Sequence, residues 1–116
     1  MKLRTITVDD ERMALRRLGR LLARSGDIEI VAECTDGPAA VAAVRQHQPD
    51  VLFLDVQMPG MTGFEVLRAL GDTRLPVVIF VTAYDEFALQ AFEARAIDYL
   101  LKPFGEARVM QALERA

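Results

Sequence analysis

A run of apolar residues at 51–54 leads directly into Asp55. A proline and a glycine soon follow, Pro59 and Gly60, and they disfavour a longer strand, so Asp55 is expected where a buried strand ends. Ligands of open parallel sheets bind at the carboxyl ends of the strands, where an acid can meet them without full burial. An aspartate that ends a strand more often only forms a turn. A chemical role for Asp55 therefore depends on partners elsewhere in the chain.

Residues of suitable type also stand at the ends of other strand-like runs. They are Asp9, Asp10, Thr82 and Lys102. An ordinary turn or salt bridge would explain any one of them alone. It is much less probable that all five residues, Asp55 included, stand at strand ends by chance. Whether the five side chains lie close together depends on how the strands are arranged.

The elements that must position these residues alternate regularly along the chain. Runs of β-branched and apolar residues predict strands at 3–8, 28–34, 51–54, 77–81 and 97–101. Apolar residues spaced three and four apart predict helices from 11 to the break at 25–27, and at 39–47, 62–70, 84–94 and 106–116. Such alternation predicts right-handed crossovers and a parallel sheet covered by helices on both faces, which is an α/β fold.

A flavodoxin-like, doubly wound (βα)5 sheet with strand order 2-1-3-4-5 would bring the five side chains to one site. In that order the second strand, which ends without a comparable residue, lies at the edge, and the other four strands are neighbours. Three carboxylates at one site repel one another, and a divalent cation that prefers oxygen ligands relieves the repulsion. Asp9, Asp10 and Asp55 therefore predict a Mg²⁺ site.

Lys102 and Thr82 add a cationic group and a hydroxyl group, which are needed beside the metal only if a further anion such as a phosphoryl group arrives. The sequence has no glycine-rich phosphate loop, so a nucleotide is not the expected donor. The five side chains together predict Mg²⁺-dependent phosphate chemistry.

Several local patterns give further expectations. Residues 62–65 have the form of a helix capping box, and the Lys102-Pro103 bond is expected to be cis. The helix at 84–94 has a weak apolar pattern with short side chains, so we expect it to move. The first helix carries arginines on its outer side, which are expected to solvate the helix, although an acidic partner could use them. These arginines are Arg12, Arg16, Arg17, Arg20 and Arg24.

Composition bounds the class of protein. The 116 residues are 52% hydrophobic, enough for the core of one domain. A net charge of −3 argues against nucleic-acid binding through a basic face of this segment. The single cysteine, Cys34, excludes an internal disulfide and favours a cytoplasmic setting. No apolar run reaches the ~18 residues of a membrane span.

With these motifs in place, the sequence resembles the receiver domains of two-component response regulators over essentially its whole length. The motifs that carry the resemblance are Val8-Asp9-Asp10-Glu11, Asp55 with Met58-Pro59-Gly60-Met61 and Gly63, Thr82-Ala83, and Tyr99-Leu100-Leu101-Lys102-Pro103-Phe104. The resemblance implies that Asp55 accepts a phosphoryl group from a sensor histidine kinase. It also implies that the backbone carbonyl of Gln57 joins the three aspartates in binding Mg²⁺. Lys102 and Thr82 would contact the phosphoryl oxygens.

The resemblance also implies how such a domain signals. Thr82 and Tyr99 would be switch residues, and phosphorylation would favour a homodimer through the surface of the fourth helix, fifth strand and fifth helix. Gln57 and Tyr84 occupy positions that resemble the family's lifetime-setting sites; neither has a carboxylate to orient water, so slow dephosphorylation is expected. The protein would not be a conventional enzyme, because its only reactions would be self-phosphorylation from a donor and slow self-dephosphorylation.

Two stretches, 82–88 and 96–99, further resemble the subgroup whose output is a LytTR-type DNA-binding domain, which regulates transcription. Residues 1–116 would then be the receiver domain, and the output domain would lie beyond Ala116.

Three other classes of protein share part of this pattern. A haloacid-dehalogenase-type phosphatase would need a second aspartate at the position of Gln57. A flavodoxin-like cofactor binder would need a phosphate-binding loop where Asp9, Asp10 and Glu11 would repel the phosphate. A phosphorylation-independent interaction domain with the same fold is the third alternative, and the complete set of site residues argues against it.

Overall fold

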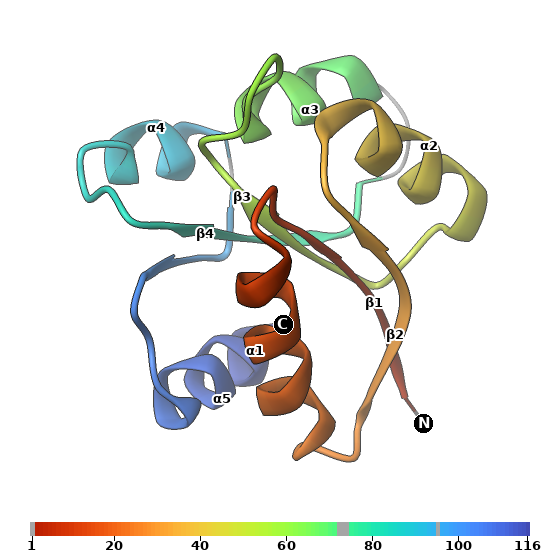
Figure 1. The fold of residues 1–116 in the computed structure, drawn as a ribbon, viewed down its shortest axis with the longest axis vertical. Coiled ribbons are helices and arrows are strands. Elements are labelled where there is room, and N and C mark those ends of the chain that lie inside the picture. The colour runs from red at the N-terminus through yellow and green to blue at the C-terminus, as the bar shows by residue number, and fades with distance from the viewer. Residues whose placement is uncertain (1, 72–74, 95) are drawn as a thin grey trace.

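The computed structural model describes residues 2–71, 75–94 and 96–116. Its centre is a parallel sheet of five strands in the order β2-β1-β3-β4-β5 (Figure 1). The strands are β1 (Leu3–Val8), β2 (Ile28–Cys34), β3 (Val51–Asp55), β4 (Val77–Thr82) and β5 (Asp98–Leu101). The helices are α1 (Arg12–Ala23), α2 (Gly37–His47), α3 (Gly63–Leu70), α4 (Ala88–Glu93) and α5 (Glu106–Arg115). The flavodoxin-like α/β fold and its strand order are as predicted.

Helices cover both faces of the sheet. Figure 1 shows α1 and α5 below the sheet and α2, α3 and α4 above it. Alternate residues of the inner strands point to the two layers: Phe53 and Ile79 pack with α1 and α5, whereas Leu54 and Phe80 pack with the other layer. Every residue of β3 is buried, which agrees with its unbroken apolar run and its central place.

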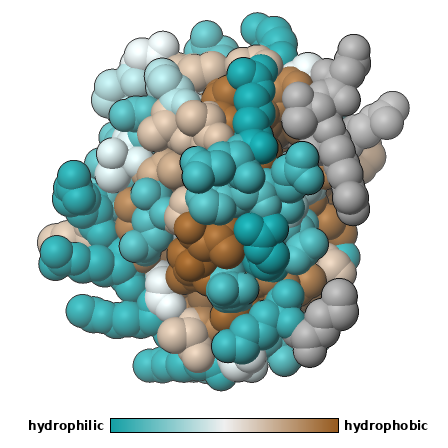
Figure 2. All heavy atoms as spheres, turned by 90° about the vertical axis from the view of Figure 1, so that its right-hand side faces the viewer, coloured by the Kyte–Doolittle hydropathy of each residue, from teal (hydrophilic) through white to brown (hydrophobic). Residues whose placement is uncertain are grey.

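The edge strand β2 is more exposed than the strands inside the sheet. Glu29 and Glu33 are solvent-exposed on it. Charged side chains on an edge strand disfavour pairing with a strand of another molecule. Figure 2 shows the side of the molecule on which β2 and α2 lie, where hydrophilic side chains surround a smaller hydrophobic area.

The local signals in the sequence are also present in the structure. Thr62 and Glu65 form the predicted capping box at the start of α3, with the Glu65 backbone N–H donating to Thr62 Oγ1 at 3.1 Å. The Lys102-Pro103 peptide bond is cis, as predicted. Cys34 is buried. Most strand and helix ends agree with the predictions to within one or two residues, the usual margin.

The prediction for the fourth helix was wrong in length. It placed helix at 84–94, whereas α4 spans only Ala88–Glu93. Residues 84–87 are not helical, because the backbone of Tyr84 bonds to Thr82 and to Tyr99 instead of continuing a helix. Only Ala91 of α4 is buried, and Phe92 is 78% exposed.

None of the helices in the described part of the chain is long and apolar enough to cross a membrane.

Candidate functional site

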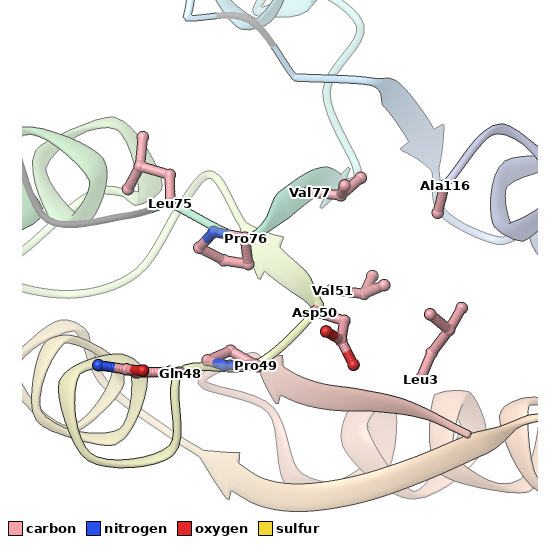
Figure 3. Close-up of a pocket in the computed structure, with 9 residues that line it drawn as sticks. All are labelled: Leu3, Gln48, Pro49, Asp50, Val51, Leu75, Pro76, Val77 and Ala116. Atoms are coloured by element: carbon pink, nitrogen blue, oxygen red, sulfur yellow. The ribbon is translucent and has the colours of Figure 1, made fainter. Parts of the chain in front are cut away.

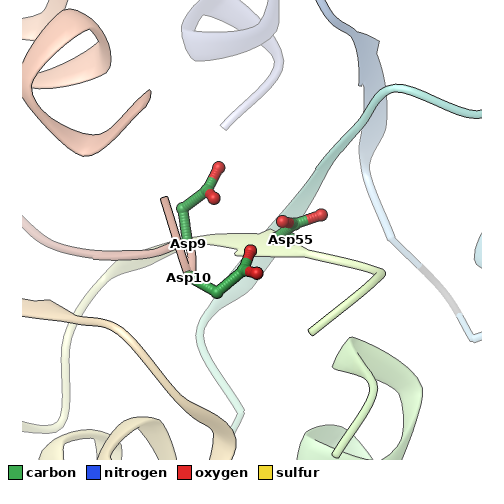
Figure 4. Close-up of side chains that lie close together, drawn as sticks. All are labelled: Asp9, Asp10 and Asp55. Carbon is green, nitrogen blue, oxygen red and sulfur yellow. The ribbon is translucent and has the colours of Figure 1, made fainter. Parts of the chain in front are cut away.

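Three aspartates meet at the carboxyl edge of the sheet. Val8 of β1 is paired with Leu54 of β3, so the residues that follow them, Asp9 and Asp55, lie side by side. Asp9 is 5% exposed and Asp55 is 4% exposed, while Asp10 is exposed. One carboxylate oxygen of each aspartate lies within 4.8 Å of those of the other two. Figure 4 shows the three side chains close together at the ends of their strands. The strand order therefore brings together the acids that the sequence placed at separate strand ends.

Lys102 supplies a positive charge to this cluster from the end of β5. Its Nζ lies 2.7 Å from Asp9 Oδ2 and 3.7 Å from Asp55 Oδ2. Glu11, which the sequence prediction left without a role, is also near, at 3.8 Å from the same Nζ. The Lys102 backbone N–H donates to the carbonyl of Thr82 at 2.8 Å, which holds the start of the loop against β4. One cation thus bridges two buried carboxylates.

The protonation of Asp55 reflects the excess of negative charge. Burial, and next the charge of Asp9, raise the pKa of Asp55 to about 7, although Lys102 and the backbone N–H of Gln57 act in the opposite direction. Burial disfavours the charged form of Lys102, but the hydrogen bond with Asp9 and the nearby carboxylates outweigh it and raise the Lys102 pKa. A single lysine therefore does not fully compensate the three carboxylates.

The donor set fits a small divalent cation. Hard cations such as Mg²⁺ take oxygen ligands at ~2.1 Å and retain several waters. Carboxylate oxygens within 4.8 Å of one another need only small movements to meet at such an ion. Asp10 is exposed, so the site is open to solvent on one side. An additional positive charge would also relieve the repulsion that raises the pKa of Asp55.

Gly63 allows α3 to approach the site closely. Its backbone N–H donates to the carbonyl of Val56 at 2.9 Å. A Cβ atom at this position would lie 2.6 Å from the backbone oxygen of Asp55, a distance that real Cβ atoms do not adopt. The absence of a side chain at Gly63 therefore allows α3 to lie this close to the end of β3.

Thr82 and Tyr99 are linked through the backbone of Tyr84. Thr82 is buried at the end of β4, and its Oγ1 accepts a hydrogen bond from the Tyr84 N–H at 3.3 Å. The Tyr99 hydroxyl donates to the Tyr84 carbonyl. Burial raises the pKa of Tyr99, so it stays protonated and able to donate. A movement of Thr82 would be transmitted to Tyr99 through this one residue.

Gln57 lies beside the acidic cluster, whereas Tyr84 contacts Thr82 and Phe87. Gln57 is exposed, and its N–H donates to Asp55 Oδ1 at 3.2 Å. The ring of Tyr84 meets the ring of Phe87 edge-on, with centroids 6.2 Å apart. This contact directs the Tyr84 ring toward the residues just before α4.

A separate pocket of about 300 Å³ lies at the opposite edge of the sheet (Figure 3). Leu3, Val51 and Val77 line it at the amino ends of three strands. The Asp50 carboxylate in its wall accepts a hydrogen bond from the backbone N–H of Arg4 at 2.8 Å. The Asp50 carboxylate thus supports the backbone of β1. We therefore assign this pocket no catalytic or binding role.

Comparison with known proteins agrees with this geometry. Residues 5–114 match the family model described as "Response regulator receiver domain". The chain is 45% identical over 113 residues to the transcriptional regulatory protein BtsR of Escherichia coli K12, covering 97% of this chain and 47% of that protein. An uncharacterised response regulatory protein of Vibrio cholerae is likewise 45% identical, with 97% and 48% covered. The chain thus spans about half the length of these relatives.

Solved structures show the same fold. The receiver domain of the putative response regulator NarL from Mycobacterium tuberculosis is 34% identical, with a TM-score of 0.88 and coverage of 97% of this chain and 94% of that one. The response regulatory domain of mrkE from Klebsiella pneumoniae is 32% identical, with a TM-score of 0.89 and coverage of 97% and 93%.

Proposed function

This chain belongs to the family of response regulator receiver domains, and on that premise we propose that it is a phosphorylation-dependent switch in two-component signalling. Such domains are signalling proteins and not conventional enzymes. The observation that carries the proposal is the cluster in which Asp9, Asp10 and Asp55 gather with Lys102 between the two buried acids.

Asp55 is the proposed phosphoacceptor, and the donor is the phosphohistidine of a sensor kinase. An Asp55 carboxylate oxygen forms a bond to phosphorus as the phosphorus–nitrogen bond breaks, and the electron pair leaves with the imidazole. Lys102, 3.7 Å from the Asp55 carboxylate, neutralises charge on the transferring oxygens. Thr82 lies on the neighbouring strand, where its hydroxyl can donate to the same group once it moves.

Mg²⁺ is the proposed cofactor. The three aspartates and the backbone carbonyl of Gln57 would hold it, and when bound it would supply positive charge beside the transferring oxygens. Residues at positions 57 and 84 have no carboxylate to orient a water molecule, so we propose that hydrolysis of the phosphorylated Asp55 is slow.

The proposed response to phosphorylation is a shift of Thr82 toward the phosphoryl group, which frees the Tyr84 backbone and repositions Tyr99. The surface affected is that of α4, β5 and α5, where Leu89 and Phe92 are exposed. Dimerisation through this surface is the proposed readout, with α4 as the moving element, since it buries only Ala91 against the rest of the domain.

The proposed output is regulation of transcription through a LytTR-type DNA-binding domain. Relatives named transcriptional regulatory proteins are about twice as long as this chain, which supports an output outside the receiver domain. The stretches 82–88 and 96–99 support the LytTR type. This segment itself is not proposed to bind nucleic acid, because its net charge is −3.

Phosphorylation by acetyl phosphate in the presence of Mg²⁺ tests the proposal. Wild-type protein should gain one phosphoryl group, located on Asp55 by mass spectrometry, and omission of Mg²⁺ should prevent the gain. The control is Asp55→Asn, which should gain none. A phosphoryl group found elsewhere, or none at all, would favour the alternative of a phosphorylation-independent interaction domain with a receiver fold.

A further inference from the structure

We infer that Arg17, on the outer side of α1, is a positioning residue for Lys102, because it holds the loop that leads from β5 to α5. The inference rests on the proposed phosphoryl transfer, in which Lys102 neutralises charge beside Asp55. The sequence pattern assigned Arg17 to a solvated helix face that an acidic partner could use, and predicted no contact within the domain. The structure instead shows it in contact with a residue that is 87 positions away in the chain.

The loop after Lys102 has few hydrogen bonds of its own. Pro103 has no backbone N–H to donate, and Gly105, the residue before α5, has no side chain to cap the helix. In the described parts of the chain, the only side-chain hydrogen bond to residues 103–105 comes from Arg17. The path of the loop therefore depends on a contact supplied by another helix.

Arg17 contacts Phe104 in two ways. Its Nη2 donates to the backbone carbonyl of Phe104 at 2.5 Å, and its guanidinium carbon lies 5.5 Å from the centroid of the Phe104 ring. The ring itself is buried in the core cluster beneath α1 and α5, with Leu18 and Val109. Both the backbone and the side chain of Phe104 are thus fixed relative to α1.

A cavity of about 100 Å³ separates α1 from this loop. Residues that line it from the two sides are Ala14, Arg17, Leu18, Lys102, Pro103 and Phe104. Although the Phe104 ring is buried, the cavity leaves Lys102 and Pro103 with incomplete contact, so van der Waals packing alone does not fix this part of the loop. Without Arg17 the loop can relax toward the cavity and take Lys102 Nζ from its place 2.7 Å from Asp9 and 3.7 Å from Asp55.

A second contact between α1 and α5 provides a matched comparison. Arg24 Nη1 lies 2.6 Å from Glu106 Oε2, but both side chains are largely exposed. Exposed ion pairs of this kind contribute little, because water screens them. Glu106 also lies within α5 and not in the loop, so loss of Arg24 should leave Lys102 in place.

The test compares Arg17→Ala with two control variants of α1, Arg20→Ala and Arg24→Ala. Acetyl phosphate is the donor, so no kinase contact with the arginines of α1 affects the rate. Arg17→Ala should lower the maximal rate of Asp55 phosphorylation about fivefold or more, with little change in the acetyl phosphate concentration that gives half the rate. Both controls should phosphorylate at the wild-type rate, and Arg17→Lys, which retains a charged donor, should recover part of the loss.

A second measurement follows Lys102 directly. The NMR signal of its Cε methylene group reports the surroundings of Nζ and should shift in Arg17→Ala but not in the controls. Wild-type rate in Arg17→Ala, or a slow variant with an unchanged Lys102 signal, would overturn the inference. If the wild type gains no phosphoryl group, the proposed function fails, and the Lys102 signal alone then decides whether Arg17 positions this side chain.

Discussion

At Asp55, burial and neighbouring carboxylates oppose the negative charge that the proposed nucleophilic attack requires. The pKa of about 7 means that a large fraction of Asp55 is protonated near neutral pH while only Lys102 compensates the cluster. A group that loses its proton less readily in the folded than in the unfolded state lowers stability as the pH rises. The ionised form of Asp55 therefore lowers the free energy of unfolding, and this effect can be measured.

We predict that Asp55→Asn removes a pH dependence of stability. The unfolded pKa is ~3.9, so wild-type protein without divalent cations should lose stability relative to the variant from about pH 4 to about pH 7. The loss should amount to a few kcal/mol, with an upper bound of ~4 kcal/mol, and should level off above that range. Urea denaturation in EDTA at several pH values measures it. An equal difference between the two proteins at pH 4 and pH 8 would contradict the assigned cause.

Gly63 is the second residue whose role is decided by a single contact. Gly63→Ala places a Cβ 2.6 Å from the Asp55 backbone oxygen, so α3 or the end of β3 must shift. We predict a loss of ~1–3 kcal/mol in unfolding free energy, together with slower phosphorylation by acetyl phosphate. Gly19→Ala is the control, because a Cβ there would make only ordinary contacts, the nearest at 3.7 Å. Equal stability of the two variants would show that the close approach does not constrain the site.

Among the elements, those with strong local signals could be predicted from the sequence. Apolar runs identified the strands, and the capping box identified the start of α3. The acidic cluster followed from the strand order, since strand ends in a parallel sheet meet at one edge. The loss of helix at 84–87 could not be predicted, because it depends on the bonds of Tyr84 to Thr82 and Tyr99. The contact of Arg17 with Phe104 could not be predicted for the same reason, since the two residues are distant in sequence.

An ion pair between β5 and α5 is a further non-local contact. Arg108 binds both carboxylate oxygens of Asp98, at 2.9 Å and 2.6 Å, and Arg115 Nη1 lies 3.4 Å from the same carboxylate. The hydrogen bonds from Arg108 hold the pKa of Asp98 below its usual range. The stabilisation is therefore present above the unfolded pKa of an aspartate and is lost as the pH falls through the lower, folded pKa.

We predict that Arg108→Ala lowers the unfolding free energy by ~1–3 kcal/mol at neutral pH, because it leaves a buried carboxylate without its main donor. Arg115→Ala should cost less, since its contact is longer and its side chain is more exposed. Denaturation at pH 7 and below pH 4 measures both effects. A cost for Arg108→Ala that does not shrink in acid would show that the charge on Asp98 is not responsible.

At the scale of the whole molecule, the chemistry and the proposed readout lie in different parts of the fold. The acidic cluster sits at the carboxyl edge of the sheet, whereas three of the exposed apolar side chains, Leu89, Phe92 and Leu101, belong to α4 and β5. Tyr84 and Tyr99 connect the two regions through one hydrogen bond. In the proposed switch, a change at the cluster would reach this apolar surface through that hydrogen bond.

We therefore predict that phosphorylation converts the protein from monomer to dimer through the α4, β5 and α5 surface. Phe92, 78% exposed on α4, and Leu89, 70% exposed, would gain most from burial between two copies. Phe92→Asp should be phosphorylated like the wild type yet remain monomeric, because a carboxylate would be buried without a partner. Sedimentation with beryllofluoride as the phosphoryl mimic measures the association. Met13→Asp is the matched control: Met13 is 81% exposed but lies on α1, outside this surface, so the variant should dimerise normally. Dimerisation of Phe92→Asp at the wild-type concentration would place the interface elsewhere.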